Sequence, residues 1–346
     1  MKKLRFIALA LAVMTFIPLF SSCAKKEPYT KTYYEYFDTV STVYSYAKEK
    51  QKDFDANCAY VSSELQSYHR LFDIYREYSG INNLKTVNDN AGKSPVKVDR
   101  KLIDFILYAK QMYDLTGGEM NIAMGSVLSL WHHKREEATV APDDASLPLS
   151  EELMSAAKHI SFDKIIIDEK ESTVFISDKE QRLDPGALGK GYATERIAAE
   201  LEARGVSSYV LDIGGNLRII GAKPDGNGWR VGITDPKNKE DGYSLCLNLS
   251  DTSCVTSGDY ERYYTVEGKN FHHIIDKDTL YPADYFASVT IVCKDSALAD
   301  ALSTALFCMP YEDGLALVSR LNADAVWIFG SGEIKMTDGI KNRLSE

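Results

Sequence analysis

The apolar positions in the first half of the chain switch between strand-like and helical spacing. Residues 32–48 are rich in Thr, Tyr and Val, which predicts β-structure. Residues 54–72 carry apolar side chains at helical spacing, and a second helical pattern begins after Asp99, a good N-cap, and stops at the glycine pair 117–118. Residues 134–157 are charged and contain proline, so we expect a surface insertion followed by a short helix there.

The second half of the chain alternates short β-rich segments with helical ones. Residues 164–176 predict a hairpin, and helices are expected at 191–204, 296–308 and 312–321. Short strands are expected at 209–213, 217–220, 229–233, 245–249, 289–292 and 325–329. Runs of strands with helices grouped among them predict an α+β fold with a largely antiparallel sheet.

The N-terminus has the pattern of an export signal. Lys2, Lys3 and Arg5 form a basic start, and residues 6–20 are an almost unbroken apolar run. A run of about fifteen residues suits a signal peptide and is shorter than the roughly twenty residues of a membrane-spanning helix.

A cysteine follows this apolar run directly. Ser21 and Ser22 are small residues that precede Cys23, an arrangement typical of bacterial lipoproteins, in which the cysteine is lipidated. We therefore expect residues 1–22 to be a lipoprotein signal peptide and residues 23–31 a flexible tether. The protein would then be anchored to the extracytoplasmic face of a cell membrane, on the periplasmic side if the cell has an outer membrane. Ordinary secretion with an incidental cysteine is the alternative.

Charge and cysteine content exclude some classes of function. The net charge of −10 would become about −13 without residues 1–22, and an acidic chain is a poor candidate for nucleic-acid binding, which needs clustered Lys and Arg. Five cysteines besides Cys23 include no C-x-x-C pair, which argues against a disulfide framework or a zinc ribbon. Cys246, Cys293 and Cys308 lie in apolar segments and are expected in the core.

The segment from Asp184 to Tyr192, with the sequence DPGALGKGY, is the most informative for chemistry. It follows a strand-like run and opens a predicted helix, whose free N–H groups can bind an anion. Lys190 adds a positive charge. The segment is not a P-loop, because Gly191 stands where a P-loop has Ser or Thr. A glycine-rich turn with a surface lysine is the alternative.

A second candidate segment is the helix predicted at 296–308. Asp300 and Thr304 are four residues apart, so their oxygens lie on one helical face. A carboxylate and a hydroxyl are ligands that magnesium accepts, with phosphates completing the shell. An amphipathic helix with an ordinary polar stripe is the alternative.

Two pairs of adjacent histidines occur in the sequence. His272 and His273 follow a β-rich run, and in a strand only one of them can face a given site. A histidine there could serve as a general base or simply pack in the core. His132 and His133 lie in a charged stretch and are interpreted as surface residues.

In this order, the segments resemble the FAD:protein FMN transferase family, also called ApbE. The resemblance extends from about residue 36 to residue 329. It rests on the sequences FDT at 37–39, FDIYR at 72–76, TGGEMN at 116–121, DPGALGKGY at 184–192, DIGGN at 212–216, TSGD at 256–259, HIID at 273–276 and AD at 299–300 with Thr304.

The resemblance implies a fold and a set of site residues. The fold would be an ApbE-like, T-fold-related, two-lobed architecture with mostly antiparallel sheets, and residues 32–346 would form the catalytic domain. Magnesium would be held by the main-chain carbonyl of Ala187 with Asp300 and Thr304, and His273 would be the general base. The FAD site would be lined by Phe37, Tyr75, Gly118, Glu119, Met120, Asn121, Asp184, Lys190 and Ile274.

The resemblance also implies a reaction, in which FMN moves from the substrate FAD to a threonine hydroxyl of an exported acceptor protein and AMP is released. Two alternatives stay open: an FAD pyrophosphatase that gives FMN and AMP, and an FAD-binding lipoprotein without turnover. Two positions depart from the pattern of many relatives. Met120-Asn121 stands where many have Phe-Asp, and Ser303 stands where some have a further acidic metal ligand. The chain itself has no obvious flavinylation motif of the D-x-x-S-G-A-T kind.

Overall fold

An eight-stranded sheet forms the centre of the fold, and each neighbouring pair of its strands is antiparallel. The computed structural model describes residues 28–238 and 242–345. The order across the sheet is β1 (Tyr29–Tyr36), β2 (Thr39–Ser45), β6 (Tyr209–Ile213), β7 (Asn216–Ile220), β10 (Ser253–Gly258), β13 (Ser288–Cys293), β14 (Asp324–Ile328) and β15 (Ile334–Met336).

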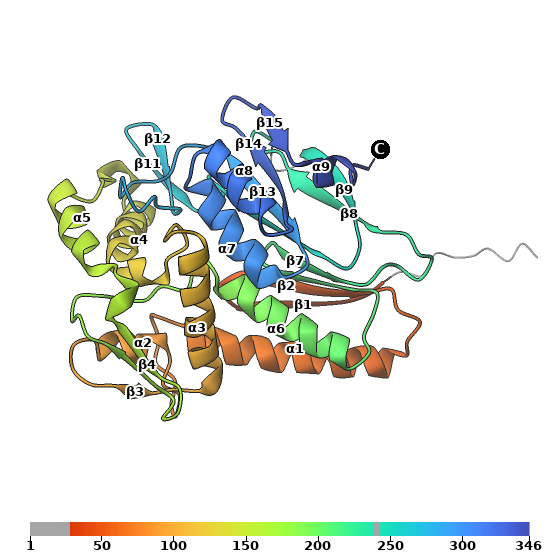
Figure 1. Cartoon of the computed structure of the whole chain (residues 1–346), viewed down its shortest axis with the longest axis horizontal. Coiled ribbons are helices and arrows are strands. Elements are labelled where there is room, and N and C mark those ends of the chain that lie inside the picture. Colours follow the sequence, from red (N-terminus) through yellow and green to blue (C-terminus); the bar gives the residue numbers. More distant parts are fainter. Residues whose placement is uncertain (1–27, 239–241, 346) are drawn as a thin grey trace, which may run out of the picture.

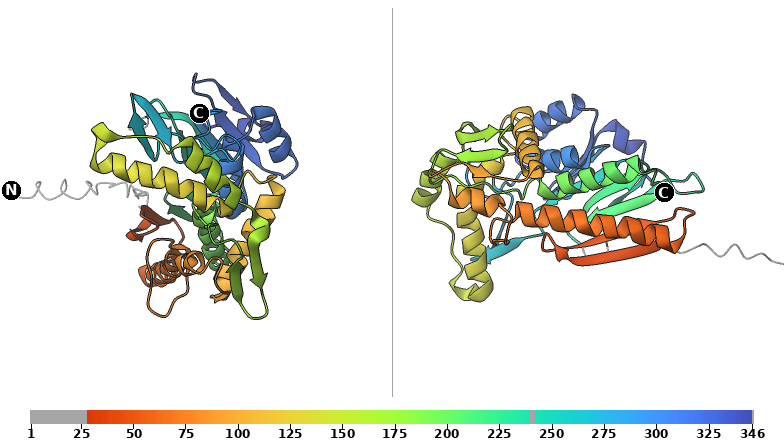
Figure 2. Two further views of the ribbon diagram at one scale, coloured as in Figure 1. Left: turned by 90° about the vertical axis from the view of Figure 1, so that its left-hand side faces the viewer. Right: turned by 90° about the horizontal axis from the view of Figure 1, so that it is seen from below.

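Alternation along the strands separates the two faces of this sheet. Tyr209, Leu211 and Ile213 of β6 pack against helices, whereas Val210 faces the opposite core with the β8–β9 hairpin. The helical face carries α1 (Gln51–Phe72), α6 (Gly189–Ala203), α7 (Ser296–Phe307) and α8 (Tyr311–Ser319). The other face carries β8 (Trp229–Thr234), β9 (Tyr243–Leu249) and α9 (Asp338–Lys341). Figure 2 shows α1 and α6 running side by side.

A second group of elements lies at the end of the molecule away from the C-terminus (Figure 1). It contains α2 (Leu84–Asp89), β3 (Val96–Lys97), α3 (Arg100–Leu115), α4 (Gly125–Val140), α5 (Ser150–Ala156), β4 (Ile165–Asp168) and β5 (Thr173–Ile176). Short 3-10 turns occur at Ile122–Met124, Pro142–Asp144, Ala157–His159 and Phe162–Lys164. The hairpin of β11 (Tyr263–Val266) and β12 (Lys269–His272) packs on α4 through Tyr264, Phe271 and Trp131. The expected α+β class with antiparallel sheets is confirmed.

Most predicted elements are confirmed, and the exceptions have physical causes. Residues 134–140 are not an insertion, because they continue α4, which buries Trp131 and Ala138 while its charged residues pair at helical spacing on the outer side. The predicted tether is too long, because β1 begins at Tyr29 and pairs with β2 from there. Strand β10 was missed, because it contains mainly small residues that pack closely against α7.

Cys58, Cys246, Cys254, Cys293 and Cys308 are free thiols. As expected, Cys293 and Cys308 are buried in the main core, while Cys246 is half-buried. Cys23 and the predicted signal peptide lie outside the described residues. Within the described ranges, none of the helices has both the length and the apolar character needed to cross a membrane.

Candidate functional site

An open pocket of about 450 Å³ lies where the end of α1, the start of α6 and one side of α4 come together. Its lining combines aromatic rings with charged side chains of both signs, which is suited to a ligand that has a flat ring and phosphates. The lining residues are Phe37, Asp38, His69, Phe72, Asp73, Ile74, Tyr75, Arg76, His132, Glu136, Asp184, Pro185, Gly186, Gly189, Lys190 and Arg262.

The turn after α1 projects Tyr75 over this pocket. Asp73 has an extended conformation that ends α1, and its Oδ1 accepts hydrogen bonds from the N–H groups of Tyr75 and Arg76 at 2.7 and 2.9 Å. The ring of Tyr75 is 57% exposed and lies 5.2 Å from the ring of His132 at an interplanar angle of 33°. Tyr75 is therefore held by its main chain with one ring face available to a ligand.

The glycine-rich segment is fixed from both ends. The side-chain amide of Asn88 donates to the carbonyl of Leu183 at 3.0 Å and accepts from its N–H at 2.8 Å. The next residue, Asp184, accepts from the N–H of Gly186 at 2.8 Å, and α6 begins at Gly189. Burial raises the pKa of the Asp184 carboxyl, and the Gly186 N–H and the guanidinium groups of Arg135 and Arg262 oppose that rise.

Lys190 is the second residue of α6 and lines the pocket. Its ammonium group makes no salt bridge with any residue in the described part of the chain, which leaves its charge available to a ligand. The ammonium group lies near two carboxyls with raised pKa values, Asp300 and Asp212. Burial is the main cause of both shifts, and Lys190 acts against each of them.

Asp300 lies on α7 directly beside the start of α6. The N–H of Gly191 donates to its Oδ2 at 2.7 Å, and only 5% of the residue is exposed. Thr304 follows one helical turn later, half-buried, as the spacing predicts. Ser303 points elsewhere, because its hydroxyl group pairs with the main-chain carbonyl of Asp300 and the hydroxyl of Ser257.

The oxygens around Asp300 fit a single hard cation. Asp300 has no salt bridge among the described residues. Burial raises its pKa, and a hydrogen bond from the side chain of Asn216 acts against that rise. The Asn216 side-chain oxygen is buried and has no hydrogen-bond partner in the described part of the chain, which leaves an acceptor that a cation would satisfy. Groups of three or more His, Cys, Asp or Glu at metal-binding spacing do not occur within residues 28–238 and 242–345, so a cation would need further oxygens from a ligand or water.

Of the adjacent histidines, His272 is held by main-chain groups, whereas His273 lies close enough to Arg262, Arg135 and Lys190 for their charges to act on it, although it is not part of the pocket lining. His272 pairs with the carbonyl of Ala283 at 2.8 Å, accepts from the N–H of Ile274 at 3.2 Å and packs on Phe307. The Nδ1 atom of His273 is buried without a hydrogen-bond partner among the described residues. Burial lowers the pKa of His273 to about 3, and the positive charge of Arg262 adds to the shift. His273 is therefore neutral at working pH, and its buried Nδ1 atom has no hydrogen-bond partner in the described part of the chain.

Two guanidinium groups, those of Arg262 and Arg135, lie close to Asp184 and to Tyr75. Arg262 lines the pocket, and Arg135 contacts Nδ1 of His132 through its Nη2 at 2.6 Å. Burial lowers the pKa of Arg135, and the charge of Arg262 lowers it further. Neither arginine forms a salt bridge with the described residues, so this part of the site also presents unneutralised positive charge.

The structure brings together four of the expected FAD-site residues, Phe37, Tyr75, Asp184 and Lys190, in the lining of one pocket. Ile274 is 7% exposed and packs in the main core beside that region. Asp300 and the segment containing Ala187 lie next to the start of α6, and Thr304 follows Asp300 by one helical turn on α7. The expected metal and pyrophosphate groups are thus adjacent.

The segment containing Gly118, Glu119, Met120 and Asn121 lies outside the lining of this pocket. Met120 is fully buried in the core, and the side chain of Asn121 is held by main-chain groups at both ends. Glu119 pairs with Lys277 at 3.1 Å, while burial raises the pKa of its carboxyl. In this conformation the segment packs in the core beside the site and does not line the pocket.

Several residues at the site were not identified from the sequence, among them His132, Arg262 and Asn216. The interpretation of His132 as a surface residue is wrong, because its half-buried ring lies at a tilt beside the ring of Tyr75 and lines the pocket. Arg262 reaches the pocket from the loop between β10 and β11, and Asn216 reaches Asp300 from β7. The sequence DIGGN pointed to the region of Asn216, but no local pattern indicated Arg262.

Comparison with known proteins gives a consistent result. A family model described as the ApbE family matches residues 37–327. A Treponema pallidum protein named FAD:protein FMN transferase is 31% identical over 321 residues, with 88% of this chain and 86% of the relative covered. A Klebsiella pneumoniae protein of the same name is 28% identical over 285 residues, covering 80% and 86%.

Solved structures show the same fold. The crystal structure of the ApbE protein from Thermotoga maritima superposes with a TM-score of 0.80 at 27% identity, covering 92% of this chain and 100% of the other. The flavin transferase ApbE from Vibrio cholerae gives a TM-score of 0.75 at 22% identity, with the same coverage.

Proposed function

The chain belongs to the ApbE family, and from that premise we propose that it transfers FMN from FAD to a threonine hydroxyl of an acceptor protein, with magnesium, and releases AMP. The main support is that the first turn of α6 contributes both to the pocket and to the contact with Asp300. The turn that places Lys190 in the pocket also donates the Gly191 N–H to Asp300, so the anion-binding and cation-binding groups share one helix start.

The pocket suits FAD as a substrate. Tyr75 offers an exposed ring face, Phe37 adds a second aromatic surface, and Lys190 and Arg262 supply positive charge for the pyrophosphate. The lining also excludes a purely apolar ligand, because Asp184 and Asp73 would then lose solvation without compensation.

Asp300, Thr304 and the carbonyl of Ala187 would hold the magnesium ion. The buried oxygen of Asn216 lies beside Asp300 and fits the same requirement for oxygen ligands. Bound magnesium would neutralise negative charge that develops on the pyrophosphate oxygens as the bond breaks. The Lys190 ammonium group would share that task at the same helix start.

His273 would take the proton of the acceptor hydroxyl. The threonine oxygen forms a new bond to the FMN phosphorus, the bond from that phosphorus to the bridging oxygen breaks, and the bridging oxygen leaves with AMP. A neutral imidazole is required for this step, and the role is supported by the Nδ1 atom of His273, which is buried without a hydrogen-bond partner among the described residues. Release of the proton from His273 to solvent restores the base.

The test is incubation of the protein with FAD, magnesium and an acceptor domain that carries the D-x-x-S-G-A-T motif. We expect the acceptor to gain the mass of FMN and AMP to appear in equal amount, and the acceptor with alanine for threonine to gain nothing. AMP without labelled acceptor would indicate a pyrophosphatase instead, and bound FAD without AMP would indicate a binding protein. Asp300→Ala should abolish the magnesium-dependent reaction, whereas Asp313→Ala, on the exposed side of α8, is the matched control.

We also propose that a lipid on Cys23 anchors the enzyme at the membrane, where exported acceptors pass. Mass spectrometry of the protein purified from its own membrane fraction would detect acyl chains on an N-terminal Cys23. Recovery of soluble protein with an unmodified N-terminus would contradict the anchor without affecting the proposed reaction.

A further inference from the structure

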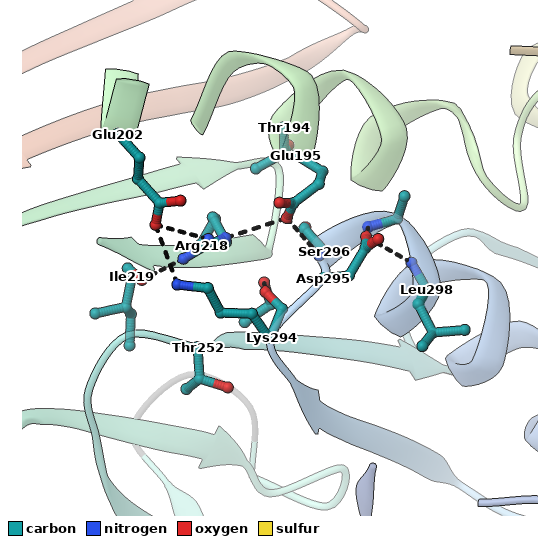
Figure 3. Close-up of polar contacts among 12 residues, drawn as sticks. Thr194, Glu195, Glu202, Arg218, Ile219, Thr252, Lys294, Asp295, Ser296 and Leu298 are labelled. Carbon is teal, nitrogen blue, oxygen red and sulfur yellow. Dashed lines mark hydrogen bonds and ion pairs between the residues drawn. The ribbon is translucent and has the colours of Figure 1, made fainter. Parts of the chain in front are cut away.

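Arg218 of β7 is a fully buried cation at the centre of an ionic network (Figure 3). Its Nε atom lies 3.1 Å from Oε2 of Glu195, and its Nη2 atom lies 2.9 Å from Oε1 of Glu202. Both carboxylates belong to α6. Lys294, which is half exposed, contacts Glu202 from the edge of the network at 3.1 Å. A buried guanidinium needs such partners, because an unpaired charge in the interior is strongly unfavourable.

Glu195 differs from Glu202 in its second contact, which is with α7. The Oε2 atom that receives Arg218 also accepts the N–H of Ser296, the first residue of α7, at 2.8 Å. One carboxylate oxygen therefore joins β7, α6 and α7 (Figure 3). Burial raises the pKa of Glu195, and the charge of Arg218 and the N–H of Ser296 act against that rise.

The same two helices are linked again one turn away, in the opposite sense. Gly191, four residues before Glu195, donates its N–H to Asp300, which is four residues after Ser296. Each helix thus offers a free N–H of its first turn to a carboxylate on the other helix. These two reciprocal bonds lie one helical turn apart, so together they fix both the distance and the rotation of α7 relative to α6.

The contact between the helices leaves no room for adjustment. A Cβ atom added to Gly191 would lie 2.3 Å from Cβ of Asp300 and 2.5 Å from the carbonyl oxygen of Ser296. Because the backbones touch here, a small shift of α7 would move Asp300 away from Lys190.

We propose that Glu195, held by Arg218, is a positioning residue that keeps Asp300 in register with the start of α6. This inference rests on the proposed function, since Asp300 is placed there as a magnesium ligand. Glu195 acts through α7 and does not touch the ligand. Its loss weakens cation binding at Asp300 about tenfold, a typical effect of removing a group that orients a ligand.

The experiment measures Mn²⁺ binding by electron paramagnetic resonance, with the full-length protein saturated with FAD and no acceptor present. Glu195→Ala should weaken Mn²⁺ binding about tenfold while FAD affinity changes less than about threefold. Glu195→Gln keeps an oxygen that accepts from Ser296 and should restore most of the lost affinity. A merely structural role would not separate cation affinity from FAD affinity in this way.

Glu202→Ala is the matched control, because it removes the other partner of Arg218 from the same helix without touching α7. It should lower the melting temperature yet leave Mn²⁺ affinity unchanged. If Glu195→Ala does not fold, Ser296→Pro replaces it. Proline is tolerated at the first position of a helix and removes the N–H that Glu195 accepts.

Equal losses of Mn²⁺ affinity in Glu195→Ala and Glu202→Ala would overturn the positioning role, as would normal affinity in Glu195→Ala or in Ser296→Pro. Failure of the unmodified protein to bind Mn²⁺ with FAD present would overturn the cation site itself, and with it this inference. Failure of the positioning role and failure of the proposed cation site therefore give different experimental results.

Discussion

The N–H of Gly191 donates a hydrogen bond of 2.7 Å to Oδ2 of Asp300, although 109 residues separate them in the sequence. This bond joins the start of α6 to the middle of α7. Because the two helices touch at Gly191, a side chain at this position would push them apart.

Gly191→Ala should therefore destabilise the protein by about 1–3 kcal/mol, because the new methyl group overlaps backbone and Asp300 atoms. Urea denaturation measures the change. Gly330→Ala is the control, since a Cβ atom at Gly330 would meet nothing within 4 Å. Similar stability of the two variants would contradict the close helix contact.

Lys190→Met should weaken the reaction with FAD about 100-fold in kcat/KM, the size of effect seen when one charge-stabilising group is removed. Lys190 carries an unneutralised charge in the pocket, whereas Lys52 is exposed near the start of α1. Steady-state kinetics of AMP release compares Lys190→Met with Lys52→Met. An unchanged kcat/KM in Lys190→Met would show that Lys190 does not stabilise the charge of the reacting groups.

Tyr75→Leu should weaken FAD binding by about 1–3 kcal/mol, the usual contribution of one aromatic ring stacked on a base. Quenching of FAD fluorescence gives the dissociation constant. Tyr34→Leu is a suitable control, because Tyr34 is 72% exposed on β1 and lies outside the pocket lining. If both variants bind FAD alike, the ring of the ligand does not lie on Tyr75.

His273 makes the stability of the folded protein depend on pH. Its pKa falls from 6.5 to about 3 on folding, so between these values the unfolded chain binds a proton that the folded protein does not. Stability from this group is fully present above about pH 6.5 and is lost as the pH falls toward 3.

His273→Gln should remove this component. Between pH 7 and pH 5, the free energy of unfolding should fall more steeply in the unmodified protein than in the variant, by at most about 1.4 kcal/mol per pH unit. Comparing the two proteins cancels the opposite contributions of Asp184 and Asp300, whose pKa values are raised. Parallel pH profiles would show that the pKa of His273 is the same in the folded and the unfolded protein, which would contradict the shift on folding.

Local signals in the sequence determined most of the helices and strands. Asp99 caps α3 through the N–H of Lys101, and Asp295 caps α7 through Ala297 and Leu298, as residues of this type do wherever a helix starts. The division of the β6 side chains between the two faces of the sheet likewise follows from the order of residues within that strand. Glycines before Lys190 indicated a helix start able to bind an anion, and the helical spacing placed Asp300 and Thr304 on one face.

Tertiary structure alone decided how these parts meet. No local pattern in the sequence paired Gly191 with Asp300, or Glu195 with Ser296. Nor did any local pattern indicate that Arg262 and His132 would lie in the same pocket as Tyr75. A helix cap or a strand with alternating side chains depends on residues only a few positions apart, so it can be predicted from the sequence alone. The site depends instead on where whole helices pack on the sheet, and many buried contacts distributed along the chain fix that packing together.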